Sequence, residues 1–295
     1  MGSLDGRVAI VTGAGSGVGR CHALALAAEG AAVVVNDLGD AADDTVAAIV
    51  DAGGSAVAHH GSVADWGTGD ELVAAATDAF GDLHILVNNA GITRDAMSFS
   101  MTEQDWDLVI DVHLKGHFVC ARAAGAYWRN QSKKGIEGPR RLIHTTSESG
   151  LFGSAGQGNY GSAKGGILTM SLVFGRELGK YGVTTNVIAP RARTPMTQHT
   201  ASMAAPEDPD AFDTYAPDNV SPFVVWLCTD DAADVTGQTF IVGGSGVWRM
   251  QPFSHLASLE LTGKRLTVAE ISARRDELFA DVDPGLPPFQ APKFG

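Results

Sequence analysis

The chain has 295 residues, 44% of them hydrophobic, and its 34 acidic residues outnumber 21 lysines and arginines to give a formal net charge of −13. This apolar content supports a sizeable core and excludes an intrinsically disordered protein, whereas the acidic balance argues against a nucleic acid or an anionic membrane surface as a partner. No stretch has the ~18 apolar residues of a membrane span, and no signal peptide is expected at the start. The three dispersed cysteines fit neither a disulfide framework nor a metal site. The sequence therefore predicts a cytoplasmic protein without a metal.

Short runs rich in valine and isoleucine alternate along the chain with longer alanine-rich stretches of helical periodicity. The short runs predict strands at 7–12, 31–36, 55–59, 84–88, 141–145, 183–188 and 238–242. The longer stretches predict helices at 19–29, 43–52, 70–80, 102–128, 159–181 and 220–229. This alternation is typical of an α/β fold with a doubly wound parallel sheet of about seven strands and helices on both faces.

The pattern predicts one domain over 1–249 and a C-terminal extension over 250–295. The connection after the strand at 183–188 spans about 30 residues with little periodicity. Loops of this length are usually lids or binding loops, so we predict a substrate lid over 191–217. In the extension, Thr267-Val-Ala-Glu270 has the pattern of a capping box and predicts a helix over 267–279.

A glycine-rich segment, Thr12-Gly-Ala-Gly-Ser-Gly-Val-Gly19, lies between the first strand and the first helix. Glycines allow a tight turn, and a helix N-terminus offers N–H donors to a pyrophosphate. Asp37 ends the second strand, where a carboxylate can accept ribose hydroxyls and repel a 2′-phosphate. The segment therefore predicts NAD(H) rather than NADP(H), against the alternatives of a glycine turn without a ligand and a simple turn aspartate.

A second motif is Tyr160-Gly-Ser-Ala-Lys164, with Ser147 thirteen residues upstream. Tyr160 and Lys164 share one helix face at this spacing. A nearby ammonium favours the phenolate, so Lys164 is expected to lower the pKa of Tyr160 toward the value that a general base requires. Ser147, just past the strand at 141–145, is placed to hold a substrate oxygen beside that phenol.

Together with Asn88-Asn-Ala-Gly91, these motifs resemble those of the short-chain dehydrogenase/reductase family over roughly residues 4–248. The resemblance implies a Rossmann-type fold, a homotetramer or dimer, and hydride transfer between an alcohol carbon and nicotinamide. It implies Tyr160 as the acid/base, Lys164 as its partner that also holds the nicotinamide ribose, and Ser147 as the residue that positions the carbonyl. The cofactor-binding residues it implies are Gly13, Ser16, Gly17, Val18, Gly19, Asp37, Ser62, Val63, Asn89, Ala90, Gly91, Tyr160, Lys164, Pro190 and Thr194.

The chain departs from the family pattern at three places. His113 stands where most members have an asparagine that fixes a water of the proton relay, so His113 is either a fourth catalytic residue or a core histidine. Ser62 replaces the usual aspartate of the adenine pocket and leaves Val63 to line it. Arg191 replaces the usual glycine after Pro190, with Thr194 able to meet the carboxamide.

Segments at 33–39, 112–116, 156–160 and 216–228 resemble the (3R)-hydroxyacyl-CoA dehydrogenase domains of multifunctional enzymes type 2 and their bacterial single-domain relatives. They imply interconversion of 3-hydroxyacyl-CoA and 3-oxoacyl-CoA. The alternatives are a 3-oxoacyl reductase and a dehydrogenase of a steroid-like or other bulky alcohol, the latter suited to an adaptable lid containing Met196, Met203, Phe212 and Tyr215. A non-catalytic NAD sensor has no need of Tyr160 or Lys164.

Two sets of basic residues are candidate contacts for an anionic thioester. The stretch at 129–141, with Arg129, Lys133, Lys134, Arg140 and Arg141, fits a solvated loop better than a CoA site. Arg191 and Arg193 are better candidates, although in an acidic protein they can equally serve as local ion-pair partners.

Overall fold

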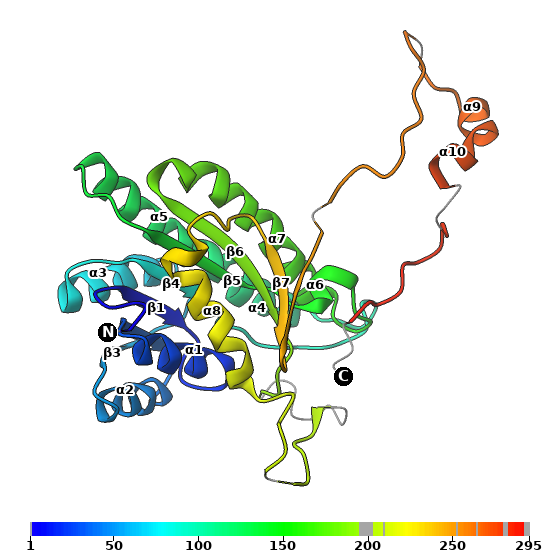
Figure 1. Cartoon of the computed structure of the whole chain (residues 1–295). Helices are drawn as coiled ribbons and strands as arrows, with labels where there is room; N and C mark the ends of the chain where they lie inside the picture. Colours follow the sequence, from blue (N-terminus) through cyan, green and yellow to red (C-terminus); the bar gives the residue numbers. More distant parts are fainter. Residues whose placement is uncertain are drawn as a thin grey trace.

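The valine- and isoleucine-rich runs form the strands of one sheet in the computed structural model, which describes residues 2–194, 203–208, 210–251, 253–263, 265–279 and 283–291 (Figure 1). The sheet has eight strands in the order β3-β2-β1-β4-β5-β6-β7-β8. The first seven are parallel and the last pair is antiparallel. The strands are β1 (Val8–Thr12), β2 (Ala32–Asp37), β3 (Ser55–His60), β4 (Ile85–Asn88), β5 (Arg140–Thr145), β6 (Val183–Pro190), β7 (Thr239–Gly243) and β8 (Gly246–Arg249).

Helices cover both faces of this sheet, which confirms the predicted doubly wound Rossmann-type fold (Figure 1). Contacts join α1 with α2 and α8 in one layer, and α5 with α3 and α7 in the other. The α-helices are α1 (Gly17–Ala28), α2 (Ala41–Asp51), α3 (Thr68–Phe80), α4 (Glu103–Ile110), α5 (Gly116–Lys133), α6 (Glu148–Phe152), α7 (Gly158–Leu178), α8 (Ser221–Cys228), α9 (Val268–Ala273) and α10 (Arg275–Phe279). Shorter turns are η1 (Asp111–Lys115), η2 (Gly179–Tyr181), η4 (Pro217–Val220) and η5 (Asp230–Ala232).

Alternate residues of the central strands serve the two layers. In β1, Ala9 and Val11 belong to the apolar cluster under α1, α2 and α8, whereas Val8 and Ile10 belong to the cluster under α3, α5 and α7. Successive side chains of a strand point to opposite faces, so a strand buried on both faces is apolar throughout. This is why the sequence of β1 is a continuous apolar run.

The structure corrects the prediction at the end of the sheet. No strand was expected beyond Gly246, yet β8 pairs with β7 through a hairpin whose turn includes Gly244 at φ 53°. β8 is a four-residue edge strand that alternates between half-buried and exposed positions. Such a short strand has too few residues for its periodicity to be read from sequence.

The structure also corrects two helices. The stretch predicted as one helix over 102–128 begins as expected, with the Asp105 N–H donating to the Thr102 hydroxyl, but a π-helical turn at η1 interrupts it and α5 continues to Lys133. The stretch predicted over 267–279 has its capping box and is divided into α9 and α10. α6, which follows Ser147 directly, was not predicted because five residues are too few to show helical periodicity.

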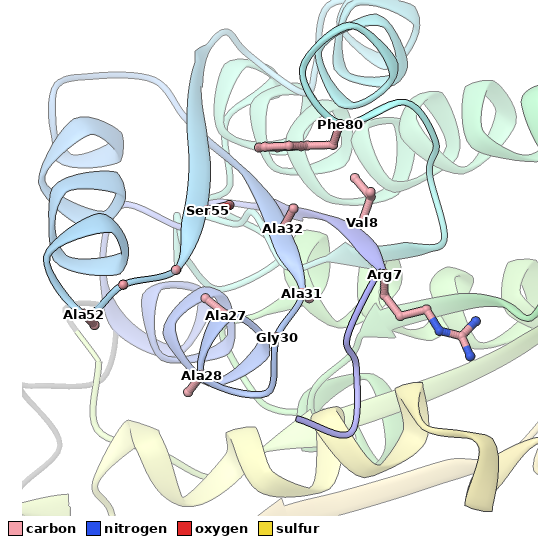
Figure 2. A pocket seen from close by; sticks show the side chains of 13 residues that line it. Arg7, Val8, Ala27, Ala28, Gly30, Ala31, Ala32, Ala52, Ser55 and Phe80 are labelled. Carbon is pink, nitrogen blue, oxygen red and sulfur yellow. The ribbon is translucent and has the colours of Figure 1, made fainter. Parts of the chain in front are cut away.

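A pocket of about 480 Å³ opens at the amino ends of β1, β2 and β3 (Figure 2). Glycines and alanines of the turns after α1 and α2 form most of its wall, and Arg7 is the one charged residue among its thirteen lining residues. In an open α/β sheet, ligands bind outside the carboxyl ends of the strands. This pocket lies at the opposite edge and brings together no catalytic groups.

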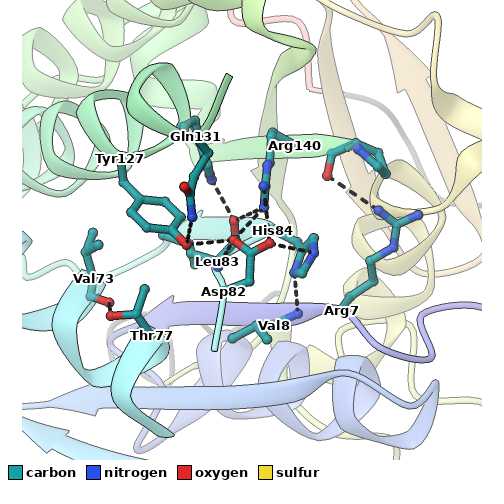
Figure 3. Close-up of polar contacts among 12 residues, drawn as sticks. Arg7, Val8, Val73, Thr77, Asp82, Leu83, His84, Tyr127, Gln131 and Arg140 are labelled. Atoms are coloured by element: carbon teal, nitrogen blue, oxygen red, sulfur yellow. Dashed lines mark hydrogen bonds and ion pairs between the residues drawn. The ribbon is translucent and has the colours of Figure 1, made fainter. Parts of the chain in front are cut away.

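Charged and polar side chains join the strands at this same amino edge (Figure 3). Arg140 is 3% exposed and donates to the Asp82 carboxylate and to the Leu83 carbonyl oxygen, while the Tyr127 hydroxyl also donates to Asp82. Arg141 is equally buried and donates to the Thr229 carbonyl oxygen. Both arginines therefore hold β5 in place, and the expectation that they belong to a solvated loop is wrong.

We predict that the protein loses stability in mild acid because of its buried histidines. His22 and His144 are fully buried, and burial lowers the pKa of each to about 3 from 6.5. The unfolded chain therefore binds protons below pH 6.5 that the folded chain does not, so this contribution to stability is complete above pH 6.5 and falls as the pH drops. Each histidine should cost about 2 kcal/mol of unfolding free energy by about pH 5, measured by urea unfolding against pH 7.5.

The control for this prediction is His22→Asn, which retains a polar partner for the Ser221 hydroxyl. It should reduce the loss between the two pH values by about 2 kcal/mol. An equal loss in the variant and the natural protein would contradict the assignment to His22.

Candidate active site

A row of polar residues crosses the carboxyl ends of the central strands. Thr12 pairs in register with Asn36, and Asn88 pairs with His144. All four are buried beneath the loops that follow β1, β2, β4 and β5. The parallel register therefore aligns these loops at one edge, where a ligand can touch all of them.

The glycine segment after β1 is anchored to the segment after β4. The Thr12 hydroxyl accepts hydrogen bonds from the N–H groups of Asn89 (2.9 Å) and Ala90 (3.1 Å). In return, the Asn89 amide donates to the carbonyl oxygens of Thr12 (3.1 Å) and Gly13 (3.2 Å). These four hydrogen bonds hold the segment at Asn89 and Ala90 against the glycine segment.

Close packing leaves no space for side chains at two of these glycines. A Cβ on Gly13, which has φ 61°, would lie 2.6 Å from the Ala90 Cα, and a Cβ on Gly19 would lie 2.2 Å from the Gly13 carbonyl oxygen. Ser16 precedes α1 but its side chain makes no capping hydrogen bond. The first turn of α1, at Gly17 and Val18, therefore keeps N–H donors for an anion, and a dinucleotide pyrophosphate fits this cradle.

Asp37 lies at the end of β2 and faces this cradle. One carboxylate oxygen accepts from the Gly15 N–H (2.9 Å) and the other from the Leu38 N–H (2.7 Å). A carboxylate can accept about four hydrogen bonds, so two acceptor positions remain for the hydroxyls of a ribose.

Ser62 and Val63 follow β3 beside the same cradle. The Ser62 hydroxyl accepts from the Ala64 N–H (3.2 Å), and its carbonyl oxygen accepts from the Thr68 hydroxyl (2.7 Å). Val63 is 6% exposed and packs against Gly116, where a Cβ would lie 2.7 Å from the valine Cγ2. Ser62 thus shapes the turn, and Val63 provides apolar surface.

The three predicted catalytic residues meet at the ends of β5 and α7. Ser147 caps α6 by accepting from the Ser149 N–H (3.2 Å), and its hydroxyl lies close enough to Tyr160 to act on the pKa of that phenol. The Lys164 ammonium lies 5.6 Å from the centroid of the Tyr160 ring and donates to the Thr145 carbonyl oxygen (2.7 Å). The α7 helix places Tyr160 and Lys164 on one face, as their spacing predicted.

The pKa of Tyr160 does not follow the prediction. Burial raises the pKa of this phenol above its ordinary value, against the lowering effect of the Ser147 hydrogen bond, and the Asp95 carboxylate raises it further. Burial also lowers the pKa of Lys164 to about 7, so its amine is only partly protonated near neutral pH. Loss of solvation thus weakens the effect predicted for Lys164, which was to lower the pKa of Tyr160.

His113 lies in the π-helical turn η1, against Tyr160. Its ring meets that of Tyr160 edge to face with centroids 5.1 Å apart, and its Nε2 bonds to the backbone of Ile92. Gly91 makes room for it, since a Cβ there would lie 2.3 Å from the His113 Cε1. Burial, and then the charge of Lys164, hold its pKa well below the ordinary value, so His113 is neutral beside the site. This position is compatible with both roles considered for it.

The start of α7 is fixed by Asn159, which the sequence motifs do not include. Asn159 is fully buried, and its amide donates to the carbonyl oxygens of Arg94 (3.0 Å) and Asp105 (3.1 Å), while its own carbonyl oxygen accepts from the Tyr160 N–H (2.7 Å). The one sequence feature that could have pointed to Asn159 is its position directly before Tyr160. Asn159 therefore sets the position from which Tyr160 reaches Ser147.

Pro190 is the last residue of β6, and Thr194 lies in the segment that follows this strand at the same edge of the sheet. Arg191 forms an ion pair with Glu148, and Arg193 forms one with Asp213. The two arginines are thus engaged as local ion-pair partners, one of the two roles considered for them. Of the predicted lid, Met196 lies outside the described residues.

The C-terminal extension leaves the sheet after β8 and returns toward α6 (Figure 1). Its Phe289 packs edge to face on Phe152 of α6 with ring centroids 5.4 Å apart. The extension also exposes apolar side chains, including Phe253 and Leu286. Within the described residues, no helix has the length and apolar character to cross a bilayer, and no cluster of three or more potential metal ligands occurs.

Comparisons with known proteins agree with this architecture. A family model described as enoyl-(acyl carrier protein) reductase matches residues 13–245. Hydroxyacyl-CoA dehydrogenase ChsB1 of Mycobacterium tuberculosis is 45% identical over 289 residues, covering 95% of this chain and 91% of that protein. Peroxisomal multifunctional enzyme type 2 of Mus musculus is 40% identical over 257 residues, covering 84% of this chain and 33% of that protein. A solved short chain dehydrogenase from Mycobacterium avium has a TM-score of 0.87 and 46% identity, and the match covers 98% of this chain and 100% of that chain.

We predict that Gly19→Ala weakens dinucleotide binding because the added methyl group has no space in the cradle. The added methyl group would lie 2.2 Å from the Gly13 carbonyl oxygen and 2.4 Å from the Asn89 amide nitrogen, so the glycine segment must move. Affinity for NADH, measured by fluorescence titration, should fall by more than about tenfold, which corresponds to about 1.4 kcal/mol.

Gly138→Ala is the matched control, because a Cβ at Gly138 meets nothing within 4 Å. It should bind NADH like the natural protein. Unchanged affinity in Gly19→Ala would show that the cofactor does not bind at this segment.

Proposed function

Because the chain belongs to the short-chain dehydrogenase/reductase family, we propose that it is an NAD-dependent 3-hydroxyacyl-CoA dehydrogenase. In this reaction a secondary alcohol and its ketone are interconverted. The observation that carries the proposal is the meeting of Ser147, Tyr160 and Lys164 at the carboxyl edge of the sheet, the same edge at which α1 begins without a side-chain cap. The named activity of the similar hydroxyacyl-CoA dehydrogenase supports the choice of substrate class.

In the proposed reaction, Tyr160 acts as the general base during alcohol oxidation. Ser147 holds the substrate oxygen close to the phenol through its hydroxyl, and the phenolate accepts the hydroxyl proton. Bound NAD⁺ would supply the hydride acceptor and a positive charge beside the phenol. That charge, together with the protonated fraction of Lys164, opposes the effect of burial on the pKa of Tyr160.

The choice of NAD over NADP rests on Asp37. Its carboxylate is held by the N–H groups of Gly15 and Leu38 in an orientation that suits the hydroxyls of an adenosine ribose. A 2′-phosphate at that position would be repelled by the carboxylate charge. Ser62 and Val63 would border the adenine, and Pro190 and Thr194 would border the carboxamide.

One observation favours a second candidate, a dehydrogenase of steroid-like or other bulky secondary alcohols without CoA. The two arginines considered as contacts for an anionic thioester are engaged with carboxylates, Arg191 with Glu148 and Arg193 with Asp213. Neither pair leaves its positive charge uncompensated for a CoA phosphate. Comparing turnover of a 3-hydroxyacyl-CoA with that of a hydroxysteroid distinguishes the two candidates.

We further propose that residues 1–249 form the catalytic domain and that the protein works as a homodimer or homotetramer. The outer side of α4 and α5 exposes large apolar residues, among them Trp106, Leu108 and Phe118. Exposed apolar patches of this kind mark interaction surfaces. Light scattering coupled to size-exclusion chromatography gives the number of subunits directly.

We predict that Tyr160→Phe abolishes oxidation while dinucleotide binding survives. The substitution removes only the phenolic oxygen, which is the proposed base, and retains the ring that packs on His113. kcat with 3-hydroxybutyryl-CoA and longer 3-hydroxyacyl-CoA esters should fall by at least about a thousandfold, monitored as NADH formation. Turnover close to that of the natural protein would exclude Tyr160 as the base, and no turnover of any of these esters by the natural protein would exclude the substrate class.

We predict that Asp37→Ser shifts the cofactor preference toward NADP. The hydroxyl cannot repel a 2′-phosphate, and it accepts fewer ribose hydrogen bonds than the carboxylate. The ratio of kcat/KM for NAD to that for NADP should fall by about a hundredfold, equivalent to about 2.7 kcal/mol. Asp40→Ser, which changes the residue just before α2, serves as the charge-matched control. The prediction fails if both variants keep the natural ratio.

A further inference from the structure

Glu148 and Arg191 form a largely buried ion pair at the candidate active site. The Arg191 Nε lies 3.4 Å from the Glu148 Oε1, and the two side chains are 14% and 15% exposed. Glu148 directly follows Ser147, and Arg191 directly follows Pro190. The pair therefore connects the segment of the proposed catalytic serine to the segment of the proposed carboxamide site.

On the Glu148 side, the backbone is fixed to α7, the helix that carries Tyr160 and Lys164. The Thr146 hydroxyl donates to the Lys164 carbonyl oxygen (2.7 Å), and Gly150 packs so closely that a Cβ would lie 2.7 Å from the Lys164 Cβ. Glu148 lies between these two contacts, in the first turn of α6. Its carboxylate thus has a defined position relative to Ser147 and Lys164.

On the Arg191 side, the segment is held against β7. The Arg191 N–H donates to the Val242 carbonyl oxygen (2.8 Å), and a Cβ on Gly243 would lie 2.5 Å from the Arg191 carbonyl oxygen. Further along, the Arg193 N–H donates to the Tyr215 carbonyl oxygen (2.7 Å). These contacts hold the segment against the end of the sheet and the lid, and the Glu148 ion pair links it to α6.

A buried ion pair is costly to place, because both charges lose water, and it stabilises a protein weakly compared with apolar packing. Burial raises the pKa of Glu148, and the charge of Arg191 acts in the opposite direction. Such pairs can instead help to select one geometry among several, because the planar guanidinium presents its N–H groups in a fixed arrangement and an unpaired buried charge is costly. The position between two functional segments is where such selection would matter.

We propose that the Glu148–Arg191 ion pair is a positioning element that sets the segment 190–194 relative to Ser147. It would thereby align the nicotinamide end of the cofactor with the substrate oxygen. This inference rests on the proposed function. Neither residue takes part in the chemistry, and the adenosine half of the cofactor, at Asp37 and Gly19, lies outside their influence.

The test compares NADH with ADP-ribose, which lacks the nicotinamide, in the natural protein and in Glu148→Gln. The variant keeps the shape of the side chain and removes its charge. NADH affinity should fall by about tenfold, and kcat by about tenfold to a hundredfold because of misalignment, whereas ADP-ribose affinity should stay within about twofold. A loss that is equal for both ligands, or absent for both with kcat unchanged, would overturn the proposal.

Asp82→Asn is the matched control, because it breaks the Asp82–Arg140 ion pair at the opposite edge of the sheet (Figure 3). It should lower the melting temperature and leave kcat and the ratio of NADH to ADP-ribose affinity unchanged. The same change of ratio in this control would show that the ratio reports stability, which also overturns the proposal.

The double variant Glu148→Gln with Arg191→Gln covers the case in which one unpaired buried charge prevents folding. It removes both charges, so the penalty of an unpaired charge is absent. The proposal requires the same selective loss of NADH affinity, and natural NADH affinity in this variant would contradict it. Binding of NADH by the natural protein without turnover of acyl-CoA would reject the proposed substrate and leave this test intact, whereas failure to bind any dinucleotide would reject both.

Discussion

The Thr12 hydroxyl accepts hydrogen bonds from two successive N–H groups, those of Asn89 and Ala90, and the geometry of the site depends on this contact. It joins the loop after β1 to the loop after β4 at the centre of the sheet. Because Thr12 is 1% exposed, water does not compete for its hydroxyl. Gly13 can then approach Ala90 closely, and α1 begins at the place where a pyrophosphate can reach its first turn.

The loop after β4 transmits this position to the catalytic side. Gly91 follows Ala90 and packs on the ring of His113, which in turn meets the ring of Tyr160. His113 lies in the π-helical turn η1. The wider backbone of this turn gives the side chain a different direction from the one it would have in a regular α-helix. The cradle for the phosphates and the proposed base are thus two ends of one continuous set of contacts.

Burial gives this set of contacts its electrostatic character. Burial lowers the pKa of His144 to about 3 and that of Lys164 to about 7, while it raises the pKa of Tyr160. Each shift favours the neutral form of the side chain. These three side chains therefore carry little charge, and a positively charged ligand beside them would change the protonation equilibrium of Tyr160 more strongly than it would in water.

Sequence reasoning succeeded where local rules decide the outcome. Val8–Thr12 is apolar enough to identify a strand buried on both faces, and the spacing of Tyr160 and Lys164 places them on one helix face. It failed where distant residues decide. Arg140 is buried in a strand because the Asp82 carboxylate pairs with its guanidinium. The pKa of Tyr160 rises because the residues packed around it exclude water. These partners are distant in sequence from Arg140 and Tyr160, so a local pattern does not reveal them.

The two edges of the sheet use buried charge differently, which bears on how this acidic chain combines stability with function. At the amino edge, Asp82 receives Arg140, Tyr127 and the Leu83 N–H, and these bonds together hold its pKa low against the effect of burial. At the carboxyl edge, Glu148 has Arg191 as its ion-pair partner, and its pKa is raised. Asp82 is thus held by several donors, whereas the position of Glu148 depends on where the segment after β6 holds the Arg191 guanidinium. This second arrangement links two segments of the chain at the edge where the ligand is proposed to bind, which is where their relative position matters for the proposed reaction.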